Sequence, residues 1–185
     1  MKKKVIYSII IVSVIIILSV AVTYAVYTFS GVVNISGTSE CFDVNYVKGQ
    51  DIGSDSNPAN FVLASTYTEG LSSVIKVNLK DTCTITNGTG TLYLNTDTSV
   101  TSSTLLSGKL LKYQVLDGTT PVGSGIVSSA ESIEIYKDIP ITTTVKTITV
   151  YIWLDGNLVT EQNQNEILSS VYKGDISMDI KSGDK

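Results

Sequence analysis

The residue types that carry most acid–base and nucleophilic chemistry are poorly represented in this chain. Its 185 residues include no histidine, and all 13 basic residues are lysines. A Ser–His–Asp or Cys–His site therefore cannot form, and no imidazole is present to bind zinc or copper. The sequence also has no phosphate-binding glycine loop and no G-x-S-x-G turn. We expect a protein that is not an enzyme.

The acidic residues and single lysines offer weaker alternatives. The carboxylates are scattered through turns and strands, so a glycosidase-like pair would have to be brought together by the fold. No motif supports Lys109 or Lys146 as a lone base, and we expect both on solvated strand faces. Asp51, Asp55 and Asn57 could converge on calcium, but their spacing is not that of an EF-hand, and such side chains are common in turns. We therefore predict no metal and no cofactor.

The charge balance argues against a nucleic-acid partner. The net charge is −4, and it becomes more negative if the first lysines are removed with a leader. Binding to a phosphate backbone usually depends on a basic patch in which arginine is prominent. Neither condition is met, so we predict no binding to nucleic acid.

Cys41 and Cys83 are the only cysteines, and both follow the apolar leader described below. An even number of thiols on the exported side favours a disulfide. A bridge closing a loop of this size would stabilise the fold by about 4 kcal/mol in the chain-entropy model. The alternative is two separate buried thiols that pack as small hydrophobic groups. Zinc is a poorer interpretation because a tetrahedral site needs further ligands.

The first 27 residues carry the targeting signal. Three lysines, Lys2 to Lys4, precede an apolar run over residues 5–22, which is about long enough to cross the hydrocarbon core as a helix. Lysines in this position keep the N-terminus in the cytoplasm, so the rest of the chain is exported. We assign residues 1–27 to a signal peptide or a signal-anchor helix.

Whether the leader is removed stays open. Thr23 and Ala25 lie at positions −3 and −1 of a candidate signal-peptidase site before Val26, which favours cleavage. The apolar run is longer than a usual signal core, and Tyr7 and Tyr24 could anchor a retained span at the two interfaces. Cleavage gives a secreted protein, and retention gives a membrane-anchored protein at the cell surface.

Residues 28–185 have the composition and patterning of an all-β domain. They are rich in Thr, Ser, Val, Ile and Tyr, and short alternating runs are separated by turn residues. Val150, Ile152 and Leu154 predict one face of a central strand, and Asn87-Gly88 predicts a hairpin turn. Short helices are expected near 104–107 and within 160–170. We predict one antiparallel β-sandwich of jelly-roll or Ig-like type.

The junction of the leader and the first strand, TYAVYTFSGVVNISGTSECFDV, resembles the start of the TasA and camelysin group of exported bacterial matrix proteins. The matching residues are Thr23, Ala25, Tyr27, Asn34, Gly37 and Thr38. The resemblance implies cleavage by a dedicated signal peptidase, a jelly-roll domain, and assembly into extracellular fibres of a biofilm matrix by donation of the N-terminal strand. The leader lacks the glycines expected before the cut, and the cysteine pair is not part of the pattern. A camelysin-like metalloprotease activity is untenable without histidine.

These observations give two functional hypotheses. In the first, the protein is a structural surface or fibre subunit that associates with itself or with another surface protein. Its donor strand lies within residues 28–36 and carries four candidate contact residues: Thr28, Val32, Val33 and Ile35. Strand addition to an open sheet edge supplies the physics. In the second, a membrane-tethered module recognises a glycan or protein through loops at 51–58 and 119–125.

Overall fold

The structure is a computed structural model that describes residues 26–31, 41–48, 59–60, 63–168 and 170–183. The predicted signal peptide or transmembrane helix lies outside these ranges, apart from Val26 and Tyr27. No helix within them is long and apolar enough to span a membrane. The predicted calcium-binding turn at 51–58 is likewise outside the described residues.

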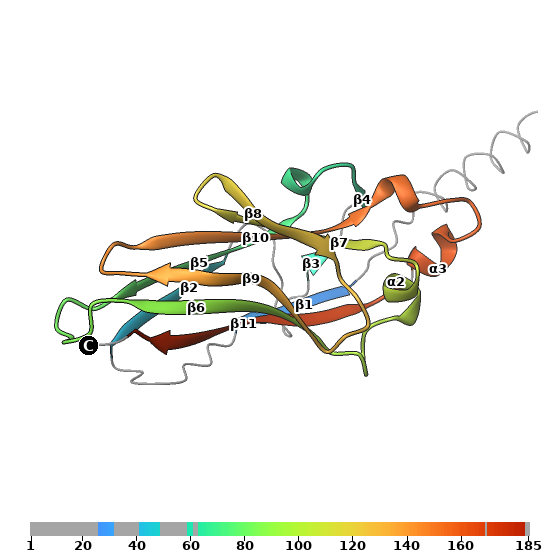
Figure 1. Ribbon diagram of the computed structural model, residues 1–185. Coiled ribbons are helices and arrows are strands. Elements are labelled where there is room, and N and C mark those ends of the chain that lie inside the picture. The colour runs from blue at the N-terminus through green and yellow to red at the C-terminus, as the bar shows by residue number, and fades with distance from the viewer. Residues whose placement is uncertain (1–25, 32–40, 49–58, 61–62, 169, 184–185) are drawn as a thin grey trace, which may run out of the picture.

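Two β-sheets lie face to face around one hydrophobic core (Figure 1). One sheet has the strand order β3-β1-β11-β6-β9, and the other has the order β2-β5-β10-β7-β8, with the short β4 beside β10. The strands are β1 (Val26–Gly31), β2 (Phe42–Lys48), β3 (Ala59–Asn60), β4 (Leu63–Ala64), β5 (Leu71–Leu79), β6 (Gly88–Thr96), β7 (Leu111–Asp117), β8 (Thr120–Ile126), β9 (Ser132–Ile141), β10 (Lys146–Asp155) and β11 (Tyr172–Ser182). The predicted all-β sandwich is confirmed at this level.

Short helical segments lie in the connections. They are η1 (Tyr67–Glu69), α2 (Ser103–Ser107), η2 (Gly156–Leu158) and α3 (Gln164–Leu168). The predicted helical turns near 104–107 and within 160–170 are therefore confirmed. Figure 1 places α2 and α3 at the same end of the sandwich.

Alternation of side chains builds the core. Ile148, Val150, Ile152 and Leu154 of β10 are at most 3% exposed, and β10 pairs with β5 on one side and β7 on the other. Burying a side chain of this size contributes roughly 1.5–3 kcal/mol, so this row alone is a large part of the hydrophobic driving force. The predicted central strand is confirmed.

Two local predictions are wrong. Asn87-Gly88 does not form a hairpin, because β5 and β6 belong to opposite sheets and residues 80–87 carry the chain across the sandwich between them. Ile85, in this crossing, is buried, so core packing overrides the local turn preference. The predicted loop at 119–125 is mostly strand, since Thr120–Ile126 pairs with β7 and only Gly118 and Thr119 remain in the turn. Gly118 is the first of these two turn residues and has φ +59°. The two-residue hairpin turns of types I′ and II′ both need a positive φ at this position.

Candidate functional site

The N-terminal strand β1 has an unusual place in the fold. It runs parallel to β11, with Tyr27 opposite Tyr172 and Gly31 opposite Ile176. The only other parallel pairing among the described strands is the two-residue contact between β4 and β10. On its other side, the described strand that pairs with β1 is β3, through two residues. Among the described strands, β1 is thus attached mainly to β11, with which it pairs over five residues (Figure 1).

Only part of the predicted donor segment is described. Thr28 lies in β1 opposite Lys173, whereas Val32, Val33 and Ile35 lie outside the described residues. Of the candidate signal-peptidase site, Thr23 and Ala25 are also outside, and Val26 is the first residue of β1.

The core side of β11 is firmly packed. Tyr172, Ile176, Met178 and Ile180 are fully buried. The Tyr172 hydroxyl lies 3.2 Å from the Thr96 hydroxyl, and burial raises the pKa of Tyr172 to about 12. The surface against which β1 lies is therefore a rigid one, because β11 also pairs over nine residues with β6.

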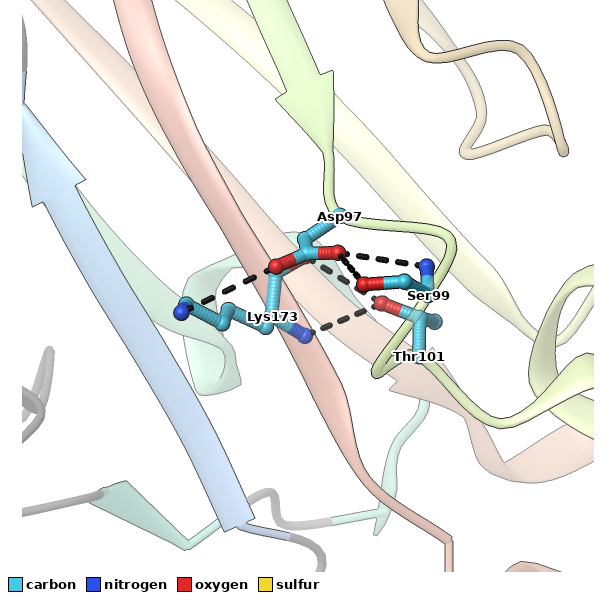
Figure 2. Close-up of polar contacts among 4 residues, drawn as sticks. All are labelled: Asp97, Ser99, Thr101 and Lys173. Carbon is cyan, nitrogen blue, oxygen red and sulfur yellow. Dashed lines mark hydrogen bonds and ion pairs between the residues drawn. The ribbon is translucent and has the colours of Figure 1, made fainter.

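A polar cluster fixes the first residues of β11 (Figure 2). The backbone N–H of Lys173 donates to the Thr101 hydroxyl at 3.1 Å, and the backbone N–H of Asp97 donates to the Lys173 carbonyl at 2.9 Å. The Asp97 carboxylate accepts hydrogen bonds from Ser99 and lies 3.7 Å from the Lys173 ammonium. The Ser99 hydroxyl, chiefly, lowers the pKa of Asp97. The loop after β6 thereby holds the start of β11, beside which β1 runs.

Cys41 and Cys83 are joined by a disulfide, with their Cα atoms 5.6 Å apart. Both are half-buried and pack against the core. The bridge links the residue before β2 to the crossing between β5 and β6. Nine residues lie between the end of β1 and Cys41.

A second candidate site lies where β7 ends and β10 begins. A shallow cavity of about 480 Å³ is lined by residues of these strand ends and of β9, among them Asp117, Pro140 and Lys146. The Asp117 carboxylate accepts from the Lys146 ammonium at 2.6 Å and from the Tyr136 hydroxyl at 2.9 Å. Burial and the Asp117 carboxylate raise the pKa of Tyr136 to about 12. Lys146 is therefore paired, contrary to the expectation of a solvated lysine.

The other predicted chemical groups are dispersed. Lys109 lies in the turn after α2 with φ 55°. Among the residues that the structure describes, no group of three or more Cys, Asp or Glu side chains is placed to hold a metal ion. Sequence reasoning missed the cluster of Tyr136, Asp117 and Lys146. Asp117 and Lys146 come from β7 and β10 of one sheet, and Tyr136 comes from β9 of the other, so no local sequence pattern brings them together.

The comparisons with known proteins give no relative: neither the known protein families nor the curated proteins contain a match to this chain.

Proposed function

We propose that the protein is an exported structural subunit that assembles into extracellular fibres by donating its N-terminal strand to a neighbouring copy. The observation that carries this proposal is the parallel attachment of β1 to β11 in an otherwise antiparallel sheet, where only the two-residue strand β3 lies outside β1 among the described strands. A terminal strand held by one main ladder can leave without disturbing the order of the other strands. The identical strand of a second copy offers the same hydrogen bonds to β11.

The strand order supports a jelly-roll interpretation of the sandwich. From β5 to β11, successive strands alternate between the two sheets except at the β7–β8 hairpin, which is the arrangement of a jelly roll. In that fold the place beside the last strand belongs to a strand that precedes β5 and runs antiparallel. Here β2 stays in the sheet of β5, and β1 takes this place in the parallel direction. We infer that the domain is a jelly roll whose first position is open to a donated strand.

Exchange between copies has a simple energetic basis. The contacts broken when β1 leaves its own domain are remade in the neighbour, so the net change in contacts is small and assembly depends on protein concentration. Each copy donates one strand and accepts another at a different part of its surface. Such a head-to-tail contact does not close on itself unless the rotation allows a ring, so it extends into a filament.

Deletion of residues 28–36 tests the proposal. The variant should keep a folded β domain by circular dichroism and should form no fibres under conditions in which the intact chain polymerises. A control variant that lacks the three residues 183–185 at the other end of the chain should still polymerise. Fibres from the 28–36 deletion indistinguishable from those of the intact chain would contradict strand donation.

We propose as a second candidate a tethered binding module, favoured by the cavity beside Asp117. The cavity combines a paired carboxylate and ammonium with threonine hydroxyls, which suits a hydroxyl-rich ligand such as a glycan. Mass spectrometry of the mature N-terminus separates the candidates. A chain beginning at Val26 favours the secreted subunit, and an intact leader favours the tethered module.

A further inference from the structure

Strand β2, the first element after β1, is held unevenly. It forms the margin of its sheet and pairs with β5 alone among the described strands. Of its first four residues only Phe42 is buried, while Asp43 and Asn45 are exposed and Val44 is half-buried. An edge strand with one buried side chain among its first four residues opens from that end at lower free-energy cost than a central strand.

Three contacts converge at the start of β2. The disulfide joins Cys41 to Cys83, and the backbone N–H of Lys80 donates to the Cys41 carbonyl at 2.9 Å. The Phe42 side chain crosses the core to Gly88 of β6, where a Cβ added to the glycine would lie 2.6 Å from the ring. Cys41 and Phe42 are thus tied to the crossing after β5 and to the opposite sheet.

The position of these contacts determines which of them is loaded first when β1 is pulled. Nine residues separate Gly31 from Cys41, which is the first described residue after β1. A pull transmitted along the chain from β1 therefore enters the described part of the domain at Cys41. Phe42 pairs with Leu79, the last residue of β5. Without a bridge, tension would load this terminal pair first and peel β2 from β5 in sequence. With the bridge, the load passes covalently from Cys41 to Cys83, which is half-buried in the crossing between β5 and β6.

We propose that the Cys41–Cys83 bridge is the anchor that holds the start of β2 against a pull from β1, the strand that precedes it in the chain. It lets β1 leave its own domain, or carry load in a neighbour, without opening β2. The load-bearing part rests on the proposed strand donation. The local anchoring of β2 does not, and it can be measured on unassembled protein.

Hydrogen–deuterium exchange, followed by mass spectrometry on the full chain as it is purified, tests the anchor. The intact protein is compared with a C41A/C83A variant and with intact protein whose bridge has been reduced and alkylated. Peptides from β10 serve as the internal reference, because this central strand pairs with β5 and β7 and not with β2. We expect amide exchange in β2 to accelerate at least about tenfold in both altered forms, while exchange in β10 is unchanged. The entropy of closing the loop between the two cysteines limits the acceleration to roughly a thousandfold.

Two results would overturn the inference: unchanged exchange in β2, or equal acceleration in β2 and β10, which would make the bridge a general stabiliser of the domain. Electron microscopy of the same intact sample reports on fibres separately. Absence of fibres would count against the proposed function and would leave the exchange data to decide the anchoring of β2.

Discussion

The contact between Phe42 and Gly88 gives a prediction that can be worked out from the structure. Phe42 is 3% exposed, and a Cβ on Gly88 would lie 2.6 Å and 2.8 Å from two atoms of its ring. Gly88 has no positive φ, so alanine is tolerated by the backbone and the ring is the principal obstacle. The two positions join β2 of one sheet to β6 of the other.

The expected free energies follow from known core substitutions. F42A should destabilise the domain by about 3–5 kcal/mol, through lost burial and the cavity that remains. G88A should cost about 1–3 kcal/mol because the ring must shift in a packed core. In F42A/G88A the added methyl group enters space that the ring has left, so the clash disappears. The double variant should therefore be more stable than the sum of the single effects predicts, by about 1–3 kcal/mol.

Urea denaturation followed by circular dichroism measures all four proteins of this cycle. Gly90 supplies the control, because it lies in the same strand but its added Cβ would meet Ile141 and not Phe42. F42A and G90A should therefore be additive within about 0.5 kcal/mol. Additive behaviour of F42A and G88A would refute the contact across the sandwich and, with it, one of the three ties at the start of β2.

Three further predictions concern charge and the bridge. D117N should move the pKa of Tyr136 from about 12 toward its ordinary value, as measured by the ultraviolet absorbance of tyrosinate. Because the pKa of Tyr136 is higher in the folded protein, its contribution to stability is present below about pH 10 and is lost as the pH rises toward 12. A tyrosinate titration that D117N leaves unchanged would show that Asp117 does not affect this pKa. The hydrogen bond from Lys112 is the main cause of the lowered pKa of Asp155, whose ordinary value is 3.8. K112M should therefore reduce the loss of stability that occurs as the pH falls below 3.8. Equal acid sensitivity of K112M and the intact protein would argue against this pairing. Reduction of the bridge should lower the Tm by roughly 10 °C in calorimetry, and a shift under about 2 °C would contradict its contribution.

The sequence patterns that repeat every second residue were the most informative about the fold. Alternation through Ile148 and Leu154 predicts both the strand and its core face, because burial on one side leaves a direct trace in residue type. Turn chemistry was less reliable. Asn87-Gly88 favours a hairpin locally, yet the chain there crosses between sheets, since the partners of β6 lie far away in β9 and β11.

The candidate sites depended on information that one strand does not carry. The parallel register of Tyr27 against Tyr172 joins the first and last described strands, and local alternation does not encode direction. The cavity cluster likewise requires the ends of β7, β9 and β10 to meet. Cys41 and Cys83 were easier to pair, because a chain with two cysteines offers only one intramolecular bridge.

Cross-linking between differently labelled copies tests strand donation most directly. Thr28 lies opposite Lys173, so T28C on one copy and K173C on another should form a disulfide only when β1 of the first lies beside β11 of the second. We predict covalent dimers between the two single variants, appearing with fibre growth, and none when K181C replaces K173C as the partner out of register. Fibres that grow without cross-links between copies, while a T28C/K173C chain closes only on itself, would contradict the account.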